Sequence, residues 1–249
     1  SAATATGDAH WAFVRLGVRK PDAPPEPDPL DITMSDPWEI PRADVRQTRP
    51  YLNDAGRGLL LLSVAQGPDA FYEPYGLLRS TDEGRTWTPI AGLDKIDTTP
   101  LPALRRPDGT ILAASRWTWT DPDGSIRGKT TRLDAGATTF SMIDSRITLP
   151  GRYANAAPGD HVICERHIWN DADGRGVTMV VWSRKQVRLP DGRAATERMS
   201  HLVRSTDEGR TWNYVSTIGP GGEPAVARLS PTELTTVIRG TRTSQMTQV

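Results

Sequence analysis

The chain has 249 residues, and its 30 basic and 30 acidic side chains leave no formal net charge at neutral pH. This balance argues against nucleic acid or an anionic membrane surface as the main partner, and no apolar run approaches the length of a transmembrane helix. The one cysteine, Cys164, excludes a disulfide within this sequence.

Residues 1–45 predict an N-terminal strand followed by a linker. Residues 10–14 (His-Trp-Ala-Phe-Val) have the composition of a strand, and the proline-rich residues 21–29 predict an extended linker. The strand either closes a ring of sheets against the last repeat or belongs to a preceding module. Residues 1–5 lack the charged and apolar regions of a signal peptide. We therefore expect that a leader has been removed and that the protein is secreted or periplasmic.

Residues 46–249 repeat a pattern of strand, turn and strand. Strands beginning near Pro50, Pro102 and Pro224 each lead through a turn into a second, more apolar strand. The first two copies align without a gap, 52 residues apart. Helical periodicity is weak throughout, and Gly and Pro interrupt the strands at regular intervals. The sequence therefore predicts an all-β fold.

One turn recurs letter for letter. Residues 79–87 and 204–212 both read Arg-Ser-Thr-Asp-Glu-Gly-Arg-Thr-Trp. We expect the aspartate to accept hydrogen bonds from its own turn, the glycine to take a positive φ, and Thr-Trp to begin the next strand. A weaker copy begins at Asp134, which lies 52 residues after Asp82. The shared offset indicates a repeat of about 50 residues, the size of one four-stranded propeller blade.

This turn resembles the Asp-box, the motif repeated in the blades of sialidases and their relatives. The resemblance implies a β-propeller of sialidase type, which has six blades in that family. The chain supplies about four: a third unit begins near His161, with a long hairpin or loop at residues 186–198, and a fourth runs from Glu223 for about two strands. We expect the rest of the propeller from residues that follow Val249.

The resemblance also implies roles for individual residues. Residues 223–226 (Glu-Pro-Ala-Val) are similar to the family strand whose glutamate, here Glu223, lies beside the tyrosine nucleophile. Arg239, sixteen residues later, matches one arginine of the triad that binds the sugar carboxylate. Arg49 best matches another, although it directly precedes its proline where the family has an intervening residue; Arg46 and Arg42 are reserves.

Asp69 occupies the loop position of the family's acid/base aspartate. Tyr72 lies on the same loop, and Trp117 alternates with Trp119 after the second apolar strand. We expect Tyr72 to shape the pocket and Trp117 to stack on sugar, with packing between strands as the competing role for Trp117.

The implied activity is that of a retaining exo-glycoside hydrolase that releases a terminal acidic sugar, such as sialic acid, from glycans. Planar guanidinium groups bind the sugar carboxylate in a bidentate manner. A tyrosine activated by a glutamate avoids the repulsion that a carboxylate nucleophile would meet, and the aspartate protonates the leaving oxygen. No cofactor or metal is expected, because Cys164 and His167 have no second ligand pair at zinc-like spacing.

Two alternatives remain open, because the family's third arginine and its tyrosine nucleophile have no match in this sequence. A non-catalytic Asp-box propeller that binds glycan or protein would lack both residues. A propeller glycosidase of different specificity would have a rebuilt pocket, which fits the shifted register at Arg49 and the pair of Trp117 and Trp119. We expect carbohydrate as the main partner.

Overall fold

The described part of the chain consists almost entirely of strands. The computed structural model describes residues 47–54, 58–65, 75–92, 100–116, 118–153, 161–230, 233–239 and 245–248. One 3₁₀ turn, Gly151–Tyr153, is the exception within these ranges. The all-β prediction is confirmed. No helix in the described ranges is long and apolar enough to span a bilayer. The strand and linker predicted in residues 1–45 lie outside them.

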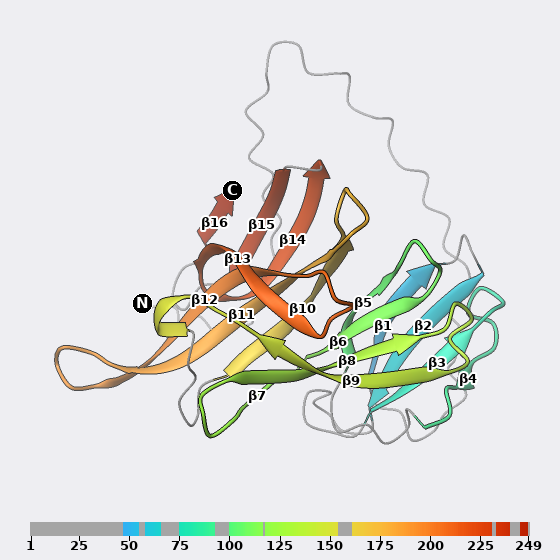
Figure 1. Cartoon of the computed structure of the whole chain (residues 1–249), viewed down its shortest axis with the longest axis horizontal. Coiled ribbons are helices and arrows are strands. Elements are labelled where there is room, and N and C mark those ends of the chain that lie inside the picture. Colours follow the sequence, from blue (N-terminus) through green and yellow to red (C-terminus); the bar gives the residue numbers. More distant parts are fainter. Residues whose placement is uncertain are drawn as a thin grey trace, which may run out of the picture. The chain divides into compact units, whose positions relative to one another are not determined.

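Four antiparallel meanders follow one another along the chain (Figure 1). The first contains β1 (Gln47–Asp54), β2 (Leu59–Ala65), β3 (Tyr75–Ser80) and β4 (Thr88–Pro89). The second contains β5 (Pro100–Arg105), β6 (Ile111–Ser115), β8 (Ile126–Leu133) and β9 (Phe140–Ile147), with β7 (Trp119–Thr120) paired to β8. The third contains β10 (His161–Asn170), β11 (Val177–Arg188), β12 (Ala194–Ser205) and β13 (Thr211–Pro220). The fourth contains β14 (Gly222–Ser230), β15 (Glu233–Arg239) and β16 (Gln245–Gln248).

The first strand of each meander is irregular in register. The pairing of β1 shifts between Pro50 and Leu52, that of β5 shifts after Pro100, and that of β14 shifts after Gly222. The prolines of the repeated pattern lie inside these irregular segments, because proline has no N–H to donate to the ladder. The three predicted copies of strand, turn and strand are confirmed, and the irregular segments occupy equivalent places in their meanders.

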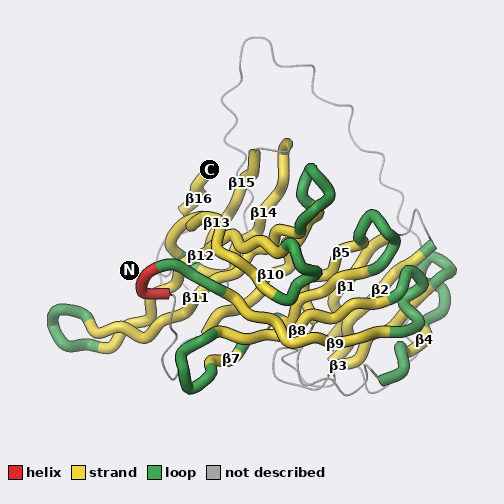
Figure 2. The backbone as a smooth tube through the Cα atoms, in the orientation of Figure 1, coloured by secondary structure: helices red, strands yellow, loops and turns green. Residues whose placement is uncertain are grey.

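The third meander contains the long hairpin or loop that the sequence predicted, and the fourth meander has one strand more than predicted. The polar residues 186–198 form a hairpin that lengthens β11 and β12, which Figure 2 shows as a projecting loop. The fourth meander has a third strand, β16, whereas the sequence predicted about two strands. That strand was missed because its residues, Gln-Met-Thr-Gln, carry little apolar or β-branched character.

The second and third meanders join into one sheet through their last strands. β9 and β13 run parallel, with Thr211 opposite Arg146 and Trp212 opposite Ile147. The Arg146 amide donates to the Arg210 carbonyl at 2.9 Å, and the Thr148 amide donates to the Trp212 carbonyl at 2.9 Å. This link was not predicted, because parallel pairing between distant strands leaves no local sequence signal.

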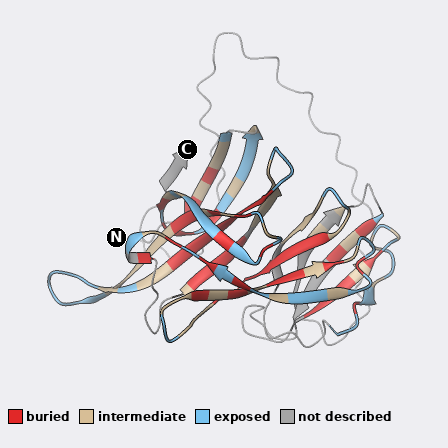
Figure 3. Ribbon diagram, in the orientation of Figure 1, coloured by how far each residue is buried: buried red, intermediate tan, exposed pale blue. Residues whose placement is uncertain are grey.

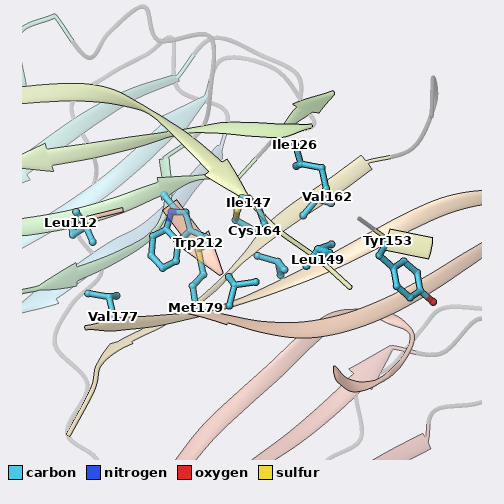
Figure 4. Close-up of a cluster of buried hydrophobic side chains, with 13 residues drawn as sticks. Leu112, Ile126, Ile147, Leu149, Tyr153, Val162, Cys164, Val177, Met179 and Trp212 are labelled. Carbon is cyan, nitrogen blue, oxygen red and sulfur yellow. The ribbon is translucent and has the colours of Figure 1, made fainter. Parts of the chain in front are cut away.

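The core lies between successive meanders, and β6 is buried on both faces (Figure 3). Ile111 and Ala113 face the first meander, where they pack with Leu61 and Leu77. The alternate residues of β6 join the cluster shared with the third meander (Figure 4), whose members include Leu112, Ala114, Ile147, Val162, Met179 and Trp212. A strand covered on both sides needs apolar residues at every position, which explains the unbroken Ile-Leu-Ala-Ala run of β6.

The two identical turns have identical hydrogen bonds, and each connects the last two strands of its meander. Asp82 accepts from the Thr86 amide at 2.8 Å and from its hydroxyl at 2.6 Å, and Ser80 Oγ donates to the same carboxylate at 2.8 Å. The Thr86 hydroxyl and amide hold the pKa of Asp82 down at about 2. Glycine takes a positive φ as predicted, +89° at Gly84, and Glu83 before it has φ +60°, which together make a type I′ turn.

The weaker copy keeps the same aspartate–threonine contact. Asp134 accepts from the Thr138 amide at 2.7 Å and from its hydroxyl at 2.9 Å. Its positive φ has moved from the glycine to Ala137, at +52°. The prediction that all three aspartates bind their own turns is therefore confirmed.

The identical turns have different neighbours, which gives a matched test. A Cβ on Gly84 would meet nothing closer than 3.5 Å, whereas a Cβ on Gly209 would lie 2.6 Å from Thr130 Cγ2 of the adjacent meander. We expect Gly84→Ala to lower the free energy of unfolding by about 1 kcal/mol through its positive φ alone. Gly209→Ala adds the overlap and should cost about 2–4 kcal/mol. Urea denaturation of both variants measures the difference, and equal losses would contradict the packing described here.

Candidate functional site

Glu223 and Arg239 meet where β14 begins and β15 ends. Gly222 pairs with Arg239 in the register of these strands. The Arg239 guanidinium donates through Nη1 to Glu223 Oε2 at 2.8 Å. The two side chains are 57% and 42% exposed, so the pair is open to solvent. The structure therefore brings together the two residues that the sequence placed sixteen positions apart.

Glu223 has an unusual backbone. Its φ is +52°, in the left-handed region that side chains other than glycine rarely adopt. The other non-glycine residues with positive φ among those described, Glu83, Ala137 and Glu208, belong to the three repeated turns. A strained residue outside a tight turn, at an exposed ion pair, is a marker of a functional position.

A buried charged cluster was not predicted. Glu165 on β10 and Arg116, which follows β6, have side chains only 8% and 7% exposed, and Arg116 Nη2 lies 3.9 Å from Glu165 Oε1. Trp182 on β11 donates from Nε1 to the same Glu165 oxygen at 2.8 Å. The Cys164 amide donates to the Arg116 carbonyl at 2.8 Å, which ties the second meander to the third. Buried charges are expensive, so a cluster of this kind is a candidate for a functional role.

The buried cluster and the exposed pair are connected through Trp182. Its indole lies against the backbone of Gly222, where an added Cβ would come within 2.8 Å of the ring. Contacts therefore run from Arg116 and Glu165 through Trp182 and Gly222 to Glu223. Residues 162–168 mix apolar residues with Glu165, Arg166 and His167, so the sequence alone did not single out Glu165.

The structure does not place the side chains of the other predicted site residues. Asp69, Tyr72 and Trp117 lie outside the described residues, as do the reserves Arg42 and Arg46. Arg49 lies on β1 opposite Ser63, and its side chain is outside what the structure describes. Trp119, the neighbour of Trp117, lies under Lys129, whose Nζ is 5.9 Å from the ring centroid.

A separate cleft of about 440 Å³ lies near the other end of β10, and none of the predicted site residues lines it. Trp169, Val215 and Leu234 form its apolar walls, and Arg204 crosses it to reach Asp171, whose carboxylate accepts from Arg204 Nε at 2.5 Å. Asp171 also accepts from the Thr178 hydroxyl at 2.7 Å. The described ranges contain no group of three or more metal-ligating side chains.

His201 is a further buried titratable group of the third meander. It is fully buried on β12, with Nε2 3.2 Å from Ser183 Oγ and Nδ1 3.2 Å from Thr217 Oγ1. The ring of Tyr153 contacts it edge-on, with centroids 5.0 Å apart. Burial lowers the pKa of His201 to about 4, so the ring is neutral near pH 7. His201 is enclosed by protein, and we assign it to stability.

Comparisons with known proteins leave the family open. No protein-family model and no curated protein sequence matches the chain. A solved protein of unknown function from Dyadobacter fermentans is 18% identical, with a TM-score of 0.49, over 77% of this chain and 61% of its own. A mannose phosphorylase from Leishmania mexicana is 10% identical over 78% and 79%, with a TM-score of 0.31. A polysaccharide lyase, the PL25 ulvan lyase, is 12% identical over 76% and 61%, with a TM-score of 0.24. This chain thus spans 61% of the Dyadobacter protein, and at such scores the function must be argued from its own residues.

Replacing Glu223 by glycine should relieve strain. Glycine adopts φ +52° without the steric cost that glutamate bears, so we expect Glu223→Gly to raise the free energy of unfolding by about 1 kcal/mol. Glu223→Gln keeps the side chain's size and should leave stability within about 0.5 kcal/mol of the parent. Urea denaturation compares the two variants; a loss of stability in the glycine variant would show that Glu223 is not strained.

The buried histidine predicts a pH dependence. Between the ordinary pKa of 6.5 and the folded value of about 4, the unfolded chain binds a proton at His201 that the native protein does not. The free energy of unfolding therefore falls as the pH falls through this window, by roughly 3 kcal/mol. His201→Gln should flatten this part of the profile, as measured by denaturant titrations at several pH values. Parallel profiles for the two proteins would refute the assignment.

Proposed function

We propose that this chain is part of a sialidase-like β-propeller and that Glu223 and Arg239 form a binding site for the carboxylate of an acidic sugar. The observation that carries the proposal is the exposed Glu223–Arg239 pair at the start of the fourth meander. Each meander is proposed to be one blade, with its first strand innermost.

Three features of the fold support a propeller. Three up-and-down meanders built on four strands are followed by a fourth of three strands, and they begin at Gln47, Pro100, His161 and Gly222. The repeated turns lie between the third and fourth strands in each of the first three meanders. The cores are formed between the faces of successive meanders, as stacked blades require.

The chemistry of the pair suits a carboxylate ligand. A guanidinium group has five N–H donors in a planar fork, and the bond to Glu223 uses one of the two on Nη1. A sugar carboxylate can take up the remaining donors of Arg239 in a bidentate arrangement. In the hydrolytic version of the proposal Glu223 activates a nucleophile and Asp69 supplies the proton to the leaving oxygen.

A second candidate function is glycan binding without hydrolysis. The observation that favours it is the partner of Glu223, which is an arginine side chain and not a tyrosine hydroxyl. In this case Arg239 would still recognise the acidic group, and no bond would be cleaved. A glycosidase with another specificity is the third version, in which the buried Arg116–Glu165 pair belongs to a pocket of different shape.

Binding of N-acetylneuraminic acid to the chain tests the carboxylate site that all three versions of the proposal share. We expect saturable binding by calorimetry, and we expect N-acetylmannosamine, which lacks the carboxylate, to bind at least about tenfold more weakly. Arg239→Ala should abolish this preference for the acidic sugar, whereas Arg228→Ala, on the far part of β14, should retain it.

Hydrolysis is measured separately, as release of the aryl group from an aryl glycoside of N-acetylneuraminic acid. Release of the aryl group, reduced at least about a hundredfold in Asp69→Asn, favours the enzyme. Binding without release favours the second candidate. Equal affinity for the acidic and neutral sugars would refute the carboxylate site.

A further inference from the structure

We infer that Trp182 is a positioning residue, which holds the start of β14 so that Glu223 faces Arg239. It acts through the backbone and does not itself contact the sugar. The inference rests on the proposed function for its ligand, although the geometry can be read without any ligand.

The indole of Trp182 is held in place by a hydrogen bond at its pyrrole N–H. Trp182 is buried, and its Nε1 donates at 2.8 Å to Glu165, a carboxylate that is itself buried beside Arg116. Hydrogen bonds to an ionised acceptor are shorter and stronger than neutral ones. The ring is therefore anchored to β10 by a bond that water does not reach.

The indole of Trp182 packs against the backbone of Gly222. An ideal Cβ at Gly222 would lie 2.8 Å from Cε3, 3.0 Å from Cδ2 and 3.1 Å from Cζ3 of the ring. All three atoms belong to the six-membered part of the indole, so the backbone rests on that ring at van der Waals distance. No side chain fits between them, which accounts for glycine at this position.

Gly221, the residue before Gly222, is held by two hydrogen bonds and by close packing. Its amide donates to the Arg198 carbonyl at 3.0 Å, and its carbonyl accepts from Ser200 Oγ at 3.0 Å. A Cβ on Gly221 would lie 2.5 Å from Ile238 Cγ2 and 2.8 Å from the Arg239 carbonyl oxygen. The two glycines thus pass through a slot between β12, the indole and the end of β15.

Glu223 leaves this slot with its left-handed φ of +52°. A left-handed residue other than glycine relaxes to a more common conformation unless its surroundings prevent it. Since Gly221 and Gly222 are clamped, the direction of the Glu223 side chain follows from the position of the indole. The guanidinium carbon of Arg198 also lies over the Trp182 ring, 5.8 Å from its centroid.

The first test reads the geometry without ligand, in the full chain, by the ¹H–¹⁵N NMR signals of Gly222, Glu223 and the Arg239 Nε–H. Trp182→Phe removes the N–H donor and shortens the ring, and we expect these three signals to move. Trp212→Phe is the matched control, because Trp212 is also buried in the core of the same meander and supplies none of the three atoms nearest to a Cβ on Gly222. Unchanged signals in Trp182→Phe would overturn the inference.

The second test uses a compensating pair. Gly222→Ala pushes the strand off the indole, and we expect it to weaken binding of N-acetylneuraminic acid by about tenfold or more. Adding Trp182→Phe makes room for the methyl group, which lets the strand return toward its place, and should recover most of this loss of affinity. A double variant that binds as weakly as Gly222→Ala, or more weakly, would refute the positioning role.

The two proposals fail in different ways. If the parent chain does not bind N-acetylneuraminic acid, the proposed function is wrong and the NMR comparison alone decides the role of Trp182. If the parent binds and the three signals do not respond to Trp182→Phe, the carboxylate site remains and the positioning role is lost.

Discussion

The repeated turns depend on one interaction, the contact of an aspartate with the threonine four residues later. The carboxylate satisfies a backbone amide that the tight turn leaves without a strand partner. The rigid tips are also where neighbouring meanders touch: Thr130 donates to the Gly209 carbonyl at 2.9 Å, and Arg79 donates to the Gly136 carbonyl at 2.9 Å. Each turn therefore closes its own hairpin, and the second and third turns also offer a fixed carbonyl to the meander before them.

The sequence was sufficient for those parts of the fold that local chemistry determines. The repeated turns, the apolar second strands and the prolines near the start of each first strand all leave signals within a few residues. The parallel contact of β9 with β13 and the short strand β16 leave none, because their partners are distant and their residues are polar or mixed. The identical turns also show that local sequence does not determine packing. Their sequences agree, yet the space around Gly84 and Gly209 differs because the neighbouring meanders differ.

The candidate site divides in a similar way. Glu223 and Arg239 were found through a family resemblance, and the antiparallel register of β14 and β15 accounts for their meeting. Arg116 follows β6, Glu165 lies on β10 and Trp182 on β11, and their burial depends on how two meanders stack. No spacing in the sequence encodes that stacking. A glutamate in a strand of mixed apolar and charged residues is ambiguous between a strand end, a metal ligand and a buried ion pair.

The two ion pairs at this place have opposite energetic character. The pair of Arg116 and Glu165 is buried, so its charges are costly to place and costly to separate. The pair of Glu223 and Arg239 is exposed, and exposed pairs contribute only about 0–1 kcal/mol to stability. Stability therefore explains neither the exposed pair nor the strained backbone of Glu223. A carboxylate ligand that binds the remaining N–H donors of Arg239 leaves its pair with Glu223 in place, and the clamped glycines hold the strand while the ligand binds. A rigid, buried support beneath an accessible surface pair is the arrangement that ligand binding requires.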